Sequence, residues 1–146
     1  RNFSLALARM KDEDHNSAMR HLNSYLIEDP KSWIGHLSRG HCNFCLRKYQ
    51  EAIKDFLTAL DLEREKSDGA HASLKRELVK AEILVSLAAA YAASDSLDEA
   101  RKYCEQANQE LRTLEDHPTQ QERIRRLRAT LDEVRAFQSR SRPARG

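Results

Sequence analysis

Residues 52–59 read AIKDFLTA, and the spacing of the small and large side chains in this stretch decides the fold. The same spacing begins at Ala18, 34 residues before Ala52, and again at Ala100, 48 residues after it. The three copies are Ala18/Leu22/Tyr25, Ala52/Phe56/Ala59 and Ala100/Cys104/Ala107. A repeat of this period is typical of stacked helical pairs, in which each pair buries its apolar face against the next.

Length and composition agree with a helical domain. The chain has 146 residues, enough for one domain with a buried core. Hydrophobic residues make up 40% and charged residues 33%, with only four glycines and three prolines, a composition typical of an all-helical protein. No apolar run reaches the roughly 18 residues that a membrane-spanning helix needs.

Cysteine content and the first residue indicate the cellular setting. Three cysteines, an odd number without a framework spacing, argue against a disulfide scaffold and favour a reducing compartment. We therefore expect an intracellular protein, cytoplasmic or nuclear. Because the chain starts with Arg1 and not Met, we expect it to be a fragment of a longer protein.

Apolar residues recur with helical spacing along almost the whole chain, and no stretch alternates like a half-buried strand. We predict an all-α fold of about seven helices. The first four cover about 2–11, 17–28, 32–46 and 49–65; the fifth has an apolar face over 74–91, the sixth starts at 96–99, and the seventh covers 118–138. Ser96 with Glu99, and Thr119 with Glu122, have the spacing of capping boxes.

The step from the second copy to the third exceeds the first step by 14 residues. These residues follow a predicted turn at 67–69, where apolar side chains continue along one helical face without a break. We therefore expect the insertion to lengthen the fifth helix, and expect this irregular part to contribute to specificity.

Residues ahead of each alanine resemble the motif of the tetratricopeptide repeat family, with a Leu-Gly or Leu-Ala pair and a Tyr on the first helix of each pair. The matches are Leu5-Ala6 and Pro30 in the first copy, Gly40 in the second, and Leu87-Ala88 with Tyr91 in the third. Departures from the motif are Arg9, Arg39, Asn43 and Cys104. An unrelated helical bundle is the alternative.

This resemblance implies three helix-turn-helix repeats, at about 2–30, 32–66 and 71–114, in a right-handed superhelix closed by a capping helix over 118–138. Residues 1–138 would form a single domain, and 139–146 a disordered basic tail with no apolar face to bury.

In the family, the first helix of each pair lines a concave groove that binds a peptide or a partner helix. The resemblance places twelve residues of this chain there: Phe3, Leu7, Met10, Leu37, Ser38, His41, Phe44, Cys45, Glu82, Val85, Ser86 and Ala89. Because most are apolar, we predict a non-catalytic adaptor that binds an apolar or amphipathic segment. Leu37, His41, Phe44 and Val85 are the expected main contacts; the alternative is that such residues pack in the core.

One branch of the family clamps the C-terminal carboxylate of heat-shock chaperones with Lys, Asn and Arg. Here those places hold Phe3, Leu7, Ser38, Glu82 and Ser86. A carboxylate would meet no paired cation and would be repelled by Glu82. A co-chaperone adaptor that lacks the usual clamp is therefore an alternative to the apolar groove.

Charge is distributed unevenly along the chain. Residues 117–146 contain eight arginines and three acidic residues, a balance of +5, whereas residues 1–116 sum to −3. The arginines are Arg123, Arg125, Arg126, Arg128, Arg135, Arg140, Arg142 and Arg145. A nucleic-acid-binding module that uses this segment is a second alternative, and self-association through the apolar groove is a third.

The residues that bear chemistry do not form a recognisable catalytic or metal motif. Cys42 and Cys45 form a Cys-x-x-Cys near His36 and His41, but a structural zinc site needs four ligands and Cys104 stands alone. The sequence also has no glycine-flanked nucleophile, no phosphate loop and no His-x-x-x-His pair. We expect no enzymatic activity, metal or cofactor.

Overall fold

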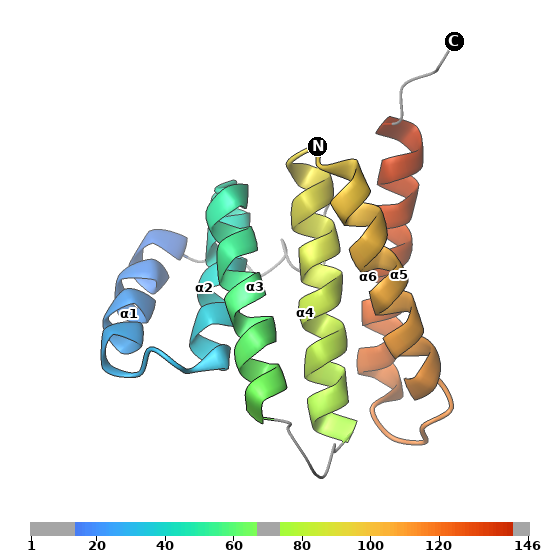
Figure 1. The fold of residues 1–146 in the computed structure, drawn as a ribbon, viewed down its shortest axis with the longest axis horizontal. Coiled ribbons are helices and arrows are strands. Elements are labelled where there is room, and N and C mark those ends of the chain that lie inside the picture. The colour runs from blue at the N-terminus through green and yellow to red at the C-terminus, as the bar shows by residue number, and fades with distance from the viewer. Residues whose placement is uncertain (1–13, 67–73, 142–146) are drawn as a thin grey trace.

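The computed structural model describes residues 14–66 and 74–141, and all regular structure in these ranges is α-helical (Figure 1). The helices are α1 (His15–Glu28), α2 (Trp33–Cys45), α3 (Tyr49–Lys66), α4 (Leu74–Ala93), α5 (Leu97–Leu114) and α6 (Gln121–Ser141). The predicted all-α fold is confirmed. The helix predicted at 2–11 and the turn at 67–69 lie outside the described residues.

The helices stack in chain order and form two layers (Figure 1). Each helix packs against the next, and α4 also contacts both α2 and α6. Among the described residues, no Cα pair within 8 Å joins α3 to α5. The even-numbered layer, α2, α4 and α6, is thus continuous through the contacts of α4 with α6 and, more weakly, with α2, whereas the odd-numbered helices do not contact one another within the described residues. The superhelical sense stays a prediction.

Two of the turns between helices have the same backbone geometry. In each, a residue with positive φ follows the helix, Arg47 at 65° and Asp95 at 68°. Each turn has the two hydrogen bonds of a Schellman motif: Lys48 N–H to Asn43 O and Arg47 N–H to Phe44 O in the first, Ser96 N–H to Tyr91 O and Asp95 N–H to Ala92 O in the second. The 48-residue spacing in the sequence is therefore also present in the backbone of α2–α3 and α4–α5.

Size complementarity explains one departure from the repeat motif, the small Cys104 in place of a large residue. A Cβ atom at Gly40 would lie 2.6 Å from Cε1 of the fully buried Phe56, so this position accepts no side chain beside the phenylalanine. The equivalent positions 48 residues later are Ala88 and Cys104, both buried. A larger residue on the first helix is thus accompanied by a smaller one on the second.

The helix starts differ from the prediction. Side-chain caps occur at α1, where Asp14 accepts from Ser17 N–H, and at α2, where Ser32 accepts from Gly35 N–H. Ser96 is the N-cap of α5 but makes no side-chain capping bond, and its own N–H already donates to Tyr91 O. The capping box predicted there is wrong because that N–H is committed to the preceding turn.

The second predicted capping box is also wrong. The first residue of α6 is Gln121, preceded by Gln120 with φ of 64°, so Thr119 is not at the N-cap. The lengthened fifth helix is confirmed, since α4 has 20 residues and α2 has 13. The last helix reaches Ser141, past the predicted boundary at 138.

Candidate functional site

The residues predicted to line the groove come from α2 and α4, in the even-numbered layer. Phe3, Leu7 and Met10 lie outside the described residues. Side chains of the other nine divide by exposure. Five are buried: Leu37, Phe44, Val85, Ser86 and Ala89. The remaining four are partly exposed: Ser38, His41, Cys45 and Glu82. The apolar members therefore belong to the core in this structure, and the accessible members are mainly polar.

One line of polar contacts crosses the even-numbered layer. His41 Nε2 on α2 lies 3.3 Å from Ser86 Oγ and 3.9 Å from Glu82 Oε2, both on α4. Arg123 Nη2 on α6 donates to Glu82 Oε1 at 3.0 Å. We call these four residues, His41, Ser86, Glu82 and Arg123, the polar row. The structure thus joins three predicted groove residues and adds a fourth from the last helix.

The two ends of the polar row differ in charge and burial. Burial lowers the pKa of His41, although the negative charge of Glu82 opposes this shift. The ring of His41 also meets Phe56 edge to face, with centroids 5.4 Å apart. The ion pair of Glu82 with Arg123 is more accessible, with side-chain exposures of 24% and 37%. The row therefore has a neutral, enclosed end and a charged, open end.

Sequence reasoning missed Arg123 as a groove residue. It attributed this arginine to the basic C-terminal segment, although Arg123 directly precedes Ile124, an apolar residue of the last helix. Because α6 packs on α4, its first turn brings the guanidinium to Glu82. One signal in the sequence pointed to it: the carboxylate of Glu82 was predicted to lie in an apolar groove without a cation beside it.

A second polar cluster joins α2 to α3 around the buried Asp55. Its carboxylate accepts hydrogen bonds from Arg39 Nη2 at 2.8 Å, Arg39 Nε at 3.0 Å and Asn43 Nδ2 at 3.1 Å. Arg39 also donates to Asn23 of α1 at 2.9 Å, and His36 Nδ1 lies 3.5 Å from Asp55. Two departures from the repeat motif, Arg39 and Asn43, therefore have a common acceptor.

This cluster has the features of a structural network. The hydrogen bonds to Asp55 raise the pKa of Arg39. A surface pocket of about 340 Å³ borders the cluster, but the Asp55 carboxylate and the Arg39 guanidinium bond to each other and to their amide neighbours. The charges of Asp55 and Arg39 therefore compensate each other.

None of the three cysteines forms a disulfide. Cys42 and Cys104 are buried and Cys45 is partly exposed. Burial raises the pKa of each thiol, that of Cys104 to about 11. At neutral pH these groups are therefore protonated and weakly nucleophilic. Within residues 14–66 and 74–141, no three His, Cys, Asp or Glu side chains gather as a metal site would require.

Most of the described arginines of the C-terminal segment pair with carboxylates of the same chain. The pairs are Arg123–Glu82, Arg125–Glu122, Arg126–Glu122 and Arg128–Glu115. Arg135 and Arg140 have no ion pair within the part of the chain that the structure describes. Arg142 and Arg145 lie outside it. The basic charge is therefore largely offset along the first half of α6.

Comparisons with known proteins leave the family open. No protein-family model matches the chain, and neither curated proteins nor solved structures give a match. Among the described helices, none is both long enough and apolar enough to cross a membrane. The tetratricopeptide resemblance therefore stays a prediction.

Proposed function

We propose that this chain is a non-catalytic protein-interaction scaffold that holds a partner's peptide or helix against the even-numbered layer. The observation that carries the proposal is the polar row, which spans α2, α4 and α6 and is partly exposed at its charged end. A single extended or helical segment that crosses these helices would meet the accessible members of the row, Glu82 and Arg123, whereas Ser86 is fully buried beneath them.

The surroundings of the row favour an amphipathic partner. Val79 precedes Glu82 by three positions and Leu127 follows Arg123 by four, so each lies one helical turn from the ion pair. Both side chains are partly buried against the core. A partner segment would place apolar side chains over Val79 and Leu127 and polar groups against Glu82 and Arg123.

The charge of the row favours protein over nucleic acid as the partner. Glu82 and Arg123 compensate each other, and three further arginines of α6 pair with acidic side chains. Little uncompensated positive charge is therefore left on this part of α6 for phosphate contacts. That none of the three cysteines is disulfide-bonded supports a reducing, intracellular location, cytoplasmic or nuclear.

Glu82 and Arg123 are the residues to test, because both are partly exposed. Leu37 and Phe44 do not suit such a test, because an aspartate in their buried positions would destabilise the core itself. Peptides that bind the chain can be selected from a displayed library of amphipathic sequences, and their affinities measured by fluorescence polarisation. We expect the charge-reversed double variant Glu82→Lys/Arg123→Glu to weaken binding roughly tenfold or more, since it inverts the polarity of the row.

A matched control is the pair Glu122–Arg125, which is 63% and 71% exposed on α6. The double variant Glu122→Lys/Arg125→Glu should bind the selected peptides as the unaltered chain does. Both variants should keep their helical circular dichroism. Equal affinities for the row variant and the control would refute the proposal, and so would a steep fall of affinity with salt, which marks phosphate-driven binding.

A further inference from the structure

The enclosed end of the polar row contains a titratable ring that faces a hydroxyl and a carboxylate. His41 Nε2 lies 3.3 Å from Ser86 Oγ and 3.9 Å from Glu82 Oε2. The side chain of His41 is only 12% exposed, and Ser86 is fully buried. Water therefore has little access to the ring, so its protonation depends mainly on these two groups of α4.

Glu82 is the one charged group that His41 meets directly among the described residues. From α3, the ring contacts the uncharged side chain of Phe56, and no described residue of α1 makes a hydrogen bond, ion pair or ring contact with it. On α2 itself, Cys45 lies one helical turn away, and burial raises the pKa of this thiol, which is thus uncharged at neutral pH. Arg123 of α6 faces His41 only through Glu82, to whose Oε1 it donates at 3.0 Å.

A neutral ring is satisfied where it stands. The hydroxyl of Ser86 both donates and accepts, so it can bond Nε2 in either tautomer. An imidazolium carries a proton on both nitrogens, and Glu82 is the anionic acceptor beside it. The 3.9 Å separation exceeds the roughly 2.7–2.9 Å of a charge-assisted hydrogen bond, so the carboxylate must move about 1 Å toward α2 to form one.

This movement acts on the ion pair at the open end of the row. Oε2 of Glu82 faces α2, whereas Oε1 bonds Arg123 of α6. The described parts of α2 and α6 lie on opposite sides of α4 and do not contact each other (Figure 1). A carboxylate that moves toward His41 therefore moves away from Arg123, and the two cations compete for it.

We propose that His41 is a proton-operated switch of the polar row. While the ring is neutral, Glu82 pairs with Arg123; when the ring is protonated, Glu82 is drawn toward α2 and Arg123 is released. As a regulator of partner binding the switch rests on the proposed function, whereas the coupling of the three side chains belongs to the free chain.

The switch operates on the acid side of an ordinary histidine. Burial lowers the pKa of His41 below its usual 6.5, and the charge of Glu82 opposes this shift without cancelling it. The unfolded chain therefore takes up this proton at a higher pH than the folded chain does. The stability that the neutral ring contributes is complete above about pH 6.5 and is lost as pH falls below that value.

The coupling is tested on the free, full chain by NMR between pH 8 and 4.5, above the ordinary pKa values of carboxylates, about 3.9–4.3. The ring signals of His41 report its protonation, and the Nε–H signal of Arg123 reports the ion pair. We expect both to change with one midpoint, below pH 6.5. Helical circular dichroism should stay constant across that midpoint.

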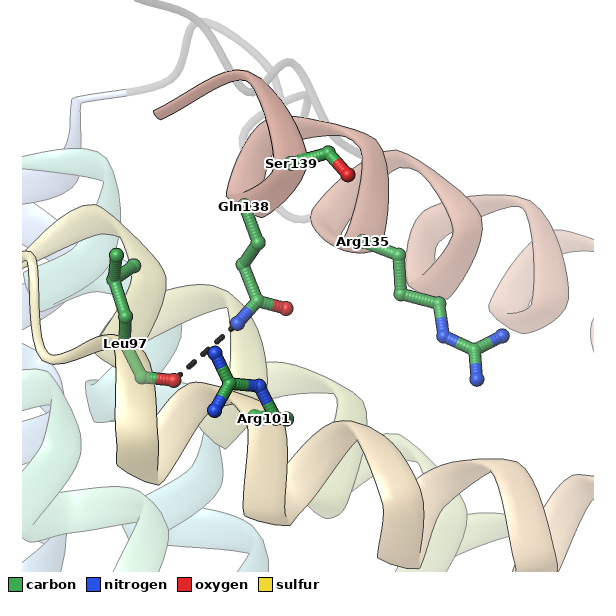
Figure 2. A pocket seen from close by; sticks show the side chains of 5 residues that line it. All are labelled: Leu97, Arg101, Arg135, Gln138 and Ser139. Atoms are coloured by element: carbon green, nitrogen blue, oxygen red, sulfur yellow. Dashed lines mark hydrogen bonds between the residues drawn. The ribbon is translucent and has the colours of Figure 1, made fainter. Parts of the chain in front are cut away.

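Arg135 provides an internal control on the same helix as Arg123. It lines a pocket of about 180 Å³ between α5 and α6, where its guanidinium points away from Arg101 and Gln138 (Figure 2). It also has no ion pair within the part of the chain that the structure describes. Its Nε–H signal should therefore not share the midpoint of His41.

Three variants assign the response. His41→Gln removes the titrating group but keeps a side chain that can bond Ser86, and it should abolish the change at Arg123. In Glu82→Gln, His41 should still titrate while Arg123 no longer responds. His21→Gln is the matched control, because His21 is exposed on α1, and it should leave the midpoint at Arg123 unchanged.

Four results would overturn the switch. The first is a His41 ring that takes up no proton above pH 4.5. The second is an Arg123 signal that stays constant while His41 titrates, and the third is a midpoint at Arg123 that persists in His41→Gln. The fourth is a change of signals throughout the chain at the same midpoint, because this would indicate global unfolding.

Binding of the selected peptides, chosen without histidine, separates this inference from the proposed function. Their affinity should fall roughly threefold or more between pH 7.5 and a pH below the midpoint, since they bind the row with Glu82 and Arg123 paired, and His41→Gln should remove this dependence. If no peptide binds the row while the NMR coupling is observed, the proposed function fails and the switch stands. If peptides bind equally well at both pH values, the switch does not regulate the site, and that part of the inference is overturned.

Discussion

The helical pairs α2–α3 and α4–α5 have the same turn but are joined by opposite kinds of contact. Between α2 and α3, Asn43 donates a hydrogen bond to the buried Asp55 at 3.1 Å. At the equivalent positions 48 residues later, Tyr91 and Tyr103 stack with centroids 5.6 Å apart and an interplanar angle of 3°. Arg39, which completes the first contact, corresponds to the buried Leu87.

This difference shows that the same backbone geometry accommodates either kind of contact between the paired helices. We call the hydrogen-bonded contact of Asn43 and Arg39 with Asp55 the polar join, and the stacking of Tyr91 on Tyr103 the aromatic join. The polar join buries a carboxylate, so its stability depends on every partner being present. The aromatic join depends on packing area and ring geometry, so we expect it to tolerate substitution better. The polar join also extends to α1 through Arg39 and Asn23, so it ties the first described helix to the stack.

Among the variants that test this difference, removal of Asp55 should lower the free energy of unfolding most. Asp55→Ala leaves Arg39 and Asn43 without their common acceptor, and loss of one partner from a buried ionic network costs about 3–5 kcal/mol. The lower end applies here, because the Arg39 side chain is 26% exposed. Urea unfolding followed by circular dichroism measures this loss in the free energy of unfolding.

The triple variant Arg39→Leu/Asn43→Tyr/Asp55→Tyr tests whether the aromatic join can replace the polar join. It replaces the polar join by the residues of the second pair. Because well-packed apolar residues can substitute for a buried ionic network, we expect it to recover most of the stability that Asp55→Ala loses. A triple variant no more stable than Asp55→Ala would show that the two joins are not interchangeable.

Cys104 and Phe56 occupy equivalent positions, but only Cys104 titrates. Burial raises the pKa of Cys104 from its ordinary value of 9.0 to about 11. Between these values the folded chain keeps a proton that the unfolded chain releases, so stability falls as pH rises from about 9 to about 11, by roughly 2–3 kcal/mol. The variant Cys104→Ala should show a shallower decline across this window. Equal slopes would contradict the assigned pKa.

Gly40 and Ala88 are the equivalent positions at which the first helix of each pair approaches the second. A Cβ at Gly40 would meet the Phe56 ring at 2.6 Å, so Gly40→Ala should destabilise the chain by about 1–3 kcal/mol despite the better helix propensity of alanine. In a Phe56→Cys background, which imitates the second pair, the same change should be neutral or stabilising. A double-mutant cycle from chemical denaturation measures the coupling, and additive effects would refute the steric explanation.

Sequence periodicity predicted the helices but not the contacts that distinguish the two pairs. The alanine anchors Ala52, Ala59, Ala100 and Ala107 are fully buried, as the repeat required, whereas in the first copy Ala18 is only partly buried and Tyr25 is 48% exposed. In contrast, Asp55 and Arg39 are 16 positions apart, and Glu82 and Arg123 are 41 apart. Helical spacing is a local signal, whereas these pairs depend on how neighbouring helices are placed, which spacing alone does not determine.

The aromatic join should give the smallest effect. Tyr103→Leu keeps an apolar side chain beside Tyr91 but removes the stacked ring, whose geometry contributes about 0.5–1.5 kcal/mol beyond its area. Tyr103→Phe keeps the ring and should change the free energy of unfolding by less than about 0.5 kcal/mol. If Tyr103→Leu destabilises the chain as much as Asp55→Ala, the second pair is as dependent on a single contact as the first, and the distinction between a polar and a tolerant aromatic join is lost.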